Sequence, residues 1–82
     1  MAQLLLFGRL AERAGWRERD QAIPLGATVA SLRAELAATE PALKTEIASK
    51  AVRAAVNHTL VGEDHALSDG DEIAFMPPFS GG

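Results

Sequence analysis

The chain has 82 residues, of which 48% are hydrophobic, and its formal net charge at pH 7 is -3. This length suits one small domain, and the hydrophobic fraction is that of a folded protein rather than a disordered one. The negative charge argues against a nucleic-acid partner. No apolar run approaches the roughly 20 residues that cross a bilayer, and the N-terminus lacks the basic region of a secretory signal. We therefore expect a cytoplasmic protein with no membrane partner.

The sequence contains no cysteine, which excludes disulfides, thiolate nucleophiles and cysteine-based metal sites. Charge is distributed unevenly, because all eight Lys and Arg residues lie at or before Arg53. Five acidic residues follow it, namely Glu63, Asp64, Asp69, Asp71 and Glu72. They form either a solvated acidic face or a docking surface for basic partners.

The first elements are predicted from short apolar and polar runs. Residues 3–7, "QLLLF", contain a short continuous apolar run and predict a strand buried on both faces. Residues 8–15 suit a short helical turn that ends at Gly15. Residues 16–25 show an alternation of polar residues and contain Pro24. Because proline has no amide hydrogen to donate to a ladder, the segment predicts an edge strand ending near Ile23.

The clearest helix follows residues 26–28, with the Thr28 hydroxyl as its expected N-cap. One apolar stripe of this helix is predicted to pack on the sheet and consists of Val29, Leu32 and Leu36. Pro41 stops the helix and begins a second short one, on which Leu43 and Ile47 stack at i, i+4.

The last third predicts a strand, a turn at residues 57–59 and a second short strand ending at Val61. A tight turn at residues 68–71 then leads into the final strand, Glu72 to Met76. On that strand Ile73 and Phe75 share one face, whereas Ala74 and Met76 share the other.

This order, β-β-α-β-β-β, predicts an α+β fold with one main helix on one face of a mixed sheet. The first strand is expected to lie centrally and parallel to the last, with the helical segments as the crossover. The layout is that of the β-grasp, or ubiquitin-like, fold. Residues 1–76 form the predicted domain, and residues 77–82 form an extended C-terminal tail.

The domain offers no evident catalytic constellation. His58 and His65 lie in predicted turns without further metal ligands at a suitable spacing, and we expect no metal site and no stably bound cofactor. Thr59 and Asp64 have no base that would make a nucleophile. A substrate, carrier or binding module is favoured over a free-standing enzyme.

The tail, "PPFSGG", is the remaining candidate for chemistry. Pro77 and Pro78 end ladder pairing and favour an extended path away from the sheet. Glycine gives the narrowest cross-section of any residue, so the end can enter a tunnel that excludes side chains. The simplest alternative for a terminal Gly-Gly is a flexible end without function.

Residues 54–82, "AAVNHTLVGEDHALSDGDEIAFMPPFSGG", resemble the small, sulfur-carrying subunit of molybdopterin synthase, the MoaD family. The resemblance rests on the "AVN" strand at 55–57, "LSDGDEIAF" at 67–75, the double proline and the terminal diglycine. Residues 1–53 agree in layout and in the "LLFG" motif. Ile73 replaces the usual Val, and Met76 stands where an aromatic residue is common.

The resemblance implies that an E1-like, ATP-dependent adenylyltransferase adenylates the Gly82 carboxylate, and that sulfur then replaces AMP to leave a thiocarboxylate. The tail would insert into the large catalytic subunit of the synthase and donate sulfur to cyclic pyranopterin monophosphate within a heterotetramer. This inserted segment consists of Pro78, Phe79, Ser80, Gly81 and Gly82. Because no thiol exists in the chain, the terminal carboxyl is where sulfur could be carried.

Candidate contacts with a partner are Phe7, Leu60, Phe75, Met76 and Phe79, and for all but Phe79 a place in the core is an equal alternative. Two other functions stay open at this point. The chain could be a ubiquitin-like modifier joined to lysines through Gly82, or an interaction domain with an inert tail.

Overall fold

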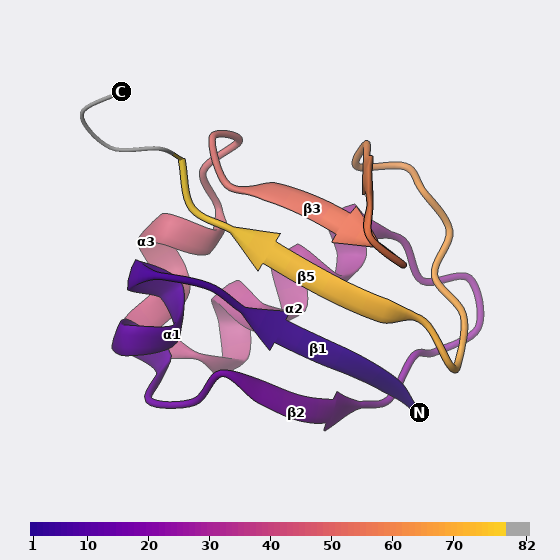
Figure 1. Cartoon of the computed structure of the whole chain (residues 1–82), viewed down its shortest axis with the longest axis horizontal. Helices are drawn as coiled ribbons and strands as arrows, with labels where there is room; N and C mark the ends of the chain where they lie inside the picture. The colour runs from indigo at the N-terminus through magenta and orange to yellow at the C-terminus, as the bar shows by residue number, and fades with distance from the viewer. Residues whose placement is uncertain (79–82) are drawn as a thin grey trace.

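The computed structural model describes residues 1–78, and its five strands form one mixed sheet (Figure 1). The strands are β1 (Ala2–Leu6), β2 (Glu18–Gln21), β3 (Arg53–Val56), β4 (Thr59–Val61) and β5 (Glu72–Met76). Their order across the sheet is β2-β1-β5-β3-β4. β1 pairs with β5 in parallel, and the other three pairings are antiparallel. The predicted parallel pairing of the first and last strands is confirmed, but the central strand is β5, and β1 lies beside it as the second strand from the edge.

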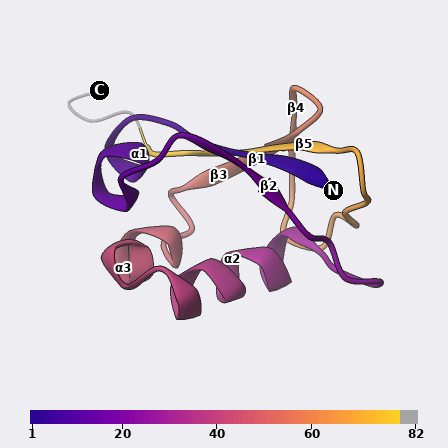
Figure 2. The same ribbon diagram turned by 90° about the horizontal axis from the view of Figure 1, so that it is seen from below.

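The helical elements are α1 (Arg9–Ala14), α2 (Val29–Thr39), the 3-10 turn η1 (Pro41–Leu43) and α3 (Lys44–Ile47). Figure 2 shows α2 and α3 together on one face of the sheet. Within residues 1–78 no helix covers the other face, which we call the open face. The predicted α+β class is confirmed. None of the helices in these residues is long and apolar enough to cross a membrane.

α2 begins as the sequence predicts. Thr28 Oγ1 accepts a hydrogen bond from the Ser31 amide at 3.2 Å, and the Thr28 amide donates to Ser31 Oγ at 2.8 Å. This reciprocal capping box satisfies two amide donors that the first helical turn leaves without partners. The predicted stripe of Val29, Leu32 and Leu36 is buried against the sheet.

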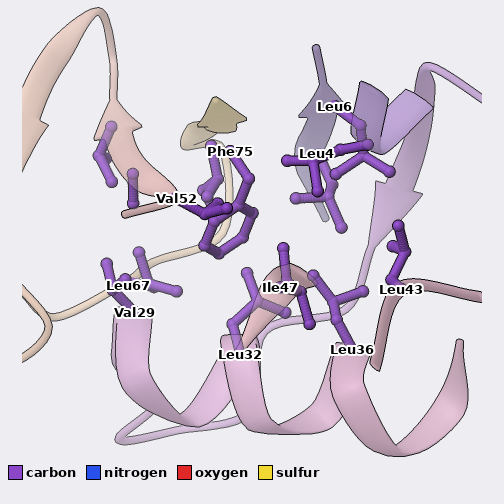
Figure 3. Close-up of a cluster of buried hydrophobic side chains, with 14 of the residues drawn as sticks. Leu4, Leu6, Val29, Leu32, Leu36, Leu43, Ile47, Val52, Leu67 and Phe75 are labelled. Carbon is purple, nitrogen blue, oxygen red and sulfur yellow. The ribbon is translucent and has the colours of Figure 1, made fainter. Parts of the chain in front are cut away.

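The core lies between the helices and the sheet. Figure 3 shows Phe75 and Leu4 reaching from the strands toward Leu32, Leu36 and Ile47 of the helical layer. Each of these side chains is at least 96% buried. Burial of a side chain of this size stabilises a fold by roughly 1.5–3 kcal/mol. This contact between layers therefore fixes which face of each strand points inward.

Two predicted strands differ from those observed. β1 is fully buried only at its alternate residues Ala2, Leu4 and Leu6, whereas Gln3 and Leu5 are half-buried. The expectation that β1 is buried on both faces was wrong, because α2 and α3 cover one face of the sheet only. β2 is an edge strand as predicted, but it ends at Gln21 rather than near Ile23.

Candidate functional site

The root of the tail lies at the end of the central strand. The ladder between β1 and β5 continues to the Phe7 amide, which donates to the Phe75 carbonyl at 3.2 Å. Pro77 follows and packs on Gly8, where a Cβ atom would stand only 3.1 Å from Pro77 Cγ. Gly8 also has a φ of +55°, a conformation that glycine adopts at little cost. The missing side chain at Gly8 thus leaves room for the first residue of the tail.

Pro78 is exposed and is the last residue that the structure describes. The other predicted tail residues, Phe79, Ser80, Gly81 and Gly82, lie outside the described residues. Their proposed roles in insertion and modification stay predictions. Since neither Pro77 nor Pro78 has an amide hydrogen, the ladder of β5 cannot continue through them.

The open face carries a patch of apolar side chains next to the tail root. Strand alternation and register place one residue from each of four strands in its middle row, and two more beside the tail. We call these residues the open-face patch: Leu5, Phe7, Ala55, Leu60, Ala74 and Met76. Phe7 is 45% exposed and Leu60 is 55% exposed. Exposed apolar side chains gathered in this way are typical of a protein–protein contact.

The structure brings together three of the predicted contact residues. Phe7, Leu60 and Met76 line one shallow hollow on the open face, with Ala55 and Ala74 between them. Phe75 does not join them, because it is fully buried and faces α2. The Arg33 guanidinium lies 5.4 Å from the centre of its ring. Of the two alternatives considered for Phe75, the core is therefore correct, and it is withdrawn as a contact residue.

Polar groups border the open-face patch at the end away from the tail. His58 Nε2 lies 2.7 Å from Glu72 Oε2, and both residues line the same hollow. Arg53 stands at the tail end, directly opposite Met76 in the register of β3 and β5. The patch thus has an ionisable pair at one end and a cation at the other.

Asn57 fixes the turn that presents Leu60. Its side chain accepts a hydrogen bond from the Glu72 amide and donates one to Asp71 Oδ1, both at 3.0 Å. Asn57 and His58 have φ values of 52° and 69°, as in a two-residue type I′ hairpin. This confirms a turn between β3 and β4 and gives the asparagine of the "AVN" motif a structural role that the sequence did not reveal.

A second unpredicted feature is the buried Arg33 of α2, which is only 7% exposed. Its guanidinium donates to both carboxylate oxygens of Glu63, at 3.0 and 2.7 Å. It also donates to the carbonyls of Ile47, Ser49 and Val52, at 2.8–3.0 Å. These five bonds use all five N–H groups of the side chain. Arg33 therefore ties α2 to the segment that leads into β3 and Arg53.

Most acidic residues after Arg53 hold loops in place. Glu63 binds Arg33, and Asp71 accepts from Asn57 and from the Ser68 amide. Glu72 faces His58, and Asp69 lies 3.7 Å from the N-terminal ammonium group. Neither a plain solvated face nor a basic-partner surface describes them fully, because four of the five have partners within the domain.

Within residues 1–78, no group of three or more His, Cys, Asp or Glu side chains could hold a metal ion. His58 faces Glu72 at the rim of the hollow. The described residues bring the start of the tail and the open-face patch together. Residues 77 and 78 leave the central strand next to an exposed apolar patch, so the start of the tail lies beside a surface that suits a protein contact.

The chain is similar to known proteins over almost all of its length. Residues 4–82 match the model of the ThiS family. The molybdopterin synthase sulfur carrier subunit of Escherichia coli (strain K12) is 39% identical over 82 residues, which is the full length of both chains.

Two solved structures show the same fold. SAMP1, small archaeal modifier protein 1, from Haloferax volcanii superposes with a TM-score of 0.86 at 30% identity, covering 99% of this chain and 98% of the other. A chain in the complex of subunits 1 and 2 of molybdopterin-converting factor from Helicobacter pylori gives a TM-score of 0.67 at 28% identity. That match covers 99% of this chain and 97% of the other. The β-grasp layout predicted from the sequence is confirmed.

Proposed function

The chain belongs to the ThiS family, and we propose that it works in the cytoplasm as the sulfur-carrier subunit of molybdopterin synthase. The structural observation that carries the proposal is the end of β5. The central strand delivers the tail at Met76, next to the exposed open-face patch. The full-length likeness to a curated sulfur carrier subunit supports the same function.

The proposed chemistry takes place at Gly82. A carboxylate reacts poorly with nucleophiles because oxide would have to leave. Attack of the carboxylate oxygen on the α-phosphorus of ATP forms a mixed anhydride with AMP and releases pyrophosphate. A sulfur nucleophile at the oxidation level of sulfide then attacks the carbonyl carbon, AMP leaves, and a thiocarboxylate remains. AMP and sulfur are thus transient groups on Gly82, and an E1-like adenylyltransferase supplies the nucleotide site.

The partner that receives sulfur is proposed to be the large catalytic subunit of the synthase. The likeness to a chain in the complex of subunits 1 and 2 of molybdopterin-converting factor from Helicobacter pylori supports a partner of this kind. In this chain the open-face patch would dock on the large subunit while residues 78–82 enter its active site. That subunit would provide the catalytic residues and bind cyclic pyranopterin monophosphate, in a heterotetramer with two carriers. The chain itself would contribute the reactive terminus and no catalytic side chain.

Mass spectrometry tests the modification directly. The carrier is incubated with ATP, a sulfide source and an E1-like activating enzyme, and its C-terminal peptide is measured. We expect one oxygen to be replaced by sulfur at Gly82. A variant lacking Gly81 and Gly82 is the control, and it should fold normally but stay unmodified. Recovery of only the free acid, under conditions in which an established carrier is converted, would contradict the proposal.

Binding to the large subunit tests the docking face. Leu60→Asp places a charge within the open-face patch, whereas Leu25→Asp makes the same change at a fully exposed leucine outside the hollow. Charging a central contact residue typically costs about 2 kcal/mol or more, or roughly 30-fold in affinity. We expect this loss for Leu60→Asp only. Equal affinities for the two variants would exclude the open face as the docking surface.

A second candidate function is that of a protein modifier, favoured by the likeness to small archaeal modifier protein 1. The same glycyl adenylate would then be passed to lysine side chains of target proteins. Conjugates that survive denaturing electrophoresis, and that disappear when Gly82 is removed, would support this role. Thiocarboxylate without such conjugates would favour the sulfur carrier.

A further inference from the structure

The charged side chains of the open face are ordered along the strands. The row nearest the tail contains Arg53 opposite Met76, with Phe7 close by. The middle row is apolar except for Glu18, which is opposite Leu5 at the β2 edge. The row farthest from the tail contains Asp20, which accepts a hydrogen bond from Gln3, and Glu72, which lies opposite Gln3 and 2.7 Å from His58. The face therefore runs from a cation beside the tail to carboxylates at the far end.

Arg53 has no evident task inside the domain. It is exposed, and it makes none of the ion pairs or side-chain hydrogen bonds found among residues 1–78. Glu63 lines the same groove, but its carboxylate is already bound by Arg33 through two hydrogen bonds. Arg13, Arg19 and Arg33 each have a carboxylate partner, whereas Arg9 and Arg17, like Arg53, have none among residues 1–78. The charge of Arg53 is thus available to a molecule that covers the open face.

An apolar patch alone does not determine how a partner is turned on it, because burial of apolar surface is non-directional. A patch with opposite charges at its two ends does, since the reversed orientation would bring like charges together. Orientation matters for a carrier, because the tail reaches a partner's site only when the tail root faces the entrance.

We propose that Arg53 at one end of the open face, and Glu72 and Asp20 at the other, set the orientation in which the protein partner docks. The partner's matching surface carries a carboxylate beside the entrance for the tail and a cationic side chain at the far end of the contact. This inference rests on the proposed function, in which the open face docks on the large synthase subunit. It adds which residues decide the docking orientation and what chemistry the partner must present.

Association kinetics with the purified large subunit test the inference. The variants are Arg53→Gln, Arg53→Glu and, as the matched control, Lys44→Glu. Lys44 is exposed on α3, in the layer opposite the open face. Both reversals lower the formal net charge of -3 by two, to -5, so general repulsion is the same for each. Unfolding in urea, followed by the fluorescence of Trp16, verifies that the variants fold.

At low salt we expect Arg53→Glu to reduce the association rate constant about tenfold, and Arg53→Gln about threefold, with less than a twofold change for Lys44→Glu. The differences should shrink at high ionic strength, because salt screens charges separated by more than about 10 Å at 0.1 M. A carboxylate-to-lysine change beside the partner's tail entrance should restore fast association with Arg53→Glu.

The possible results distinguish an error in the orienting role of Arg53 from an error in the docking face. If the wild-type carrier binds and Arg53→Glu matches Lys44→Glu at every salt concentration, the orienting role of Arg53 is wrong while the docking face stands. If Leu60→Asp and Leu25→Asp also bind equally well, the open face is not the contact, and the docking face and the orienting role of Arg53 are both wrong.

Discussion

Replacing Arg33 by alanine should cost the domain a large part of its stability. The side chain is only 9% exposed and donates five hydrogen bonds. Two of these hydrogen bonds are fully buried, and their acceptors are the carbonyls of Ile47 and Val52. Alanine removes every donor and leaves these two acceptors without a side-chain partner.

The size of the loss follows from the burial of each acceptor. A buried polar group left without its hydrogen bond costs about 1–3 kcal/mol, so the two carbonyls together account for about 2–6 kcal/mol. Glu63 adds little, because its side chain is 45% exposed and water can solvate it. We expect about 4 kcal/mol, against a total of roughly 4–12 kcal/mol for a domain of this length.

Urea unfolding measures this loss. Trp16 is the only tryptophan of the chain and is partly buried, with its indole N–H bonded to Glu40 at 3.2 Å, so its fluorescence should report unfolding. The control is Arg13→Ala, which breaks an ion pair whose side chains are 56% and 24% exposed and should cost less than about 1 kcal/mol. If Arg33→Ala destabilises the domain no more than Arg13→Ala does, the argument from buried acceptors is refuted.

Three further changes test other parts of the fold by the same measurement. Thr28→Ala removes the side-chain acceptor of the capping box and should cost about 1 kcal/mol, and no loss would mean that water replaces the cap. Asn57→Ala leaves the Glu72 amide without its acceptor and strains a residue at positive φ, so we expect about 1–3 kcal/mol. A loss no greater than that of His58→Ala would contradict the role given to the Asn57 side chain. Phe75→Ala should cost about 3–5 kcal/mol through the cavity it leaves, whereas Leu60→Ala should stay within about 0.5 kcal/mol. Similar losses for the two would refute the assignment of Phe75 to the core and Leu60 to the open face.

Local patterns in the sequence were sufficient to predict much of the fold. The stripe of α2 and its Thr28 cap are visible because helix periodicity and capping involve residues three or four apart. The parallel pairing of β1 and β5 followed from the apolar first strand and the long helical crossover. These features depend on neighbours in the chain or on general rules of topology.

The orientation of β5 shows what a pattern leaves undecided. Alternation separates Phe75 from Met76, but it does not say which of them faces the helices. A usable signal was present, because Met76 shares its face with Glu72, and a charged residue on that face favours exposure. Arg33 could not be placed in this way, since its acceptors at residues 47–52 come close only after the chain has folded.

The apolar run of β1 was misinterpreted for a related reason. Leu5 and Phe7 made the strand look buried on both sides, although they lie on the open face. A surface that binds another protein can be as apolar as a protein core. The composition of a strand alone therefore does not distinguish the two.

The position of β5 has a consequence for synthesis of the protein. Among residues 1–78, β5 follows every other helix and strand, yet it lies between β1 and β3 in the sheet. A nascent chain whose residues 72–76 are still inside the ribosome cannot pair these two strands or place Phe75 in the core. Chains stalled or broken before residue 72 should therefore stay open to proteases. The chain can fold only after translation has passed Met76, and the codons for the tail follow directly after that point.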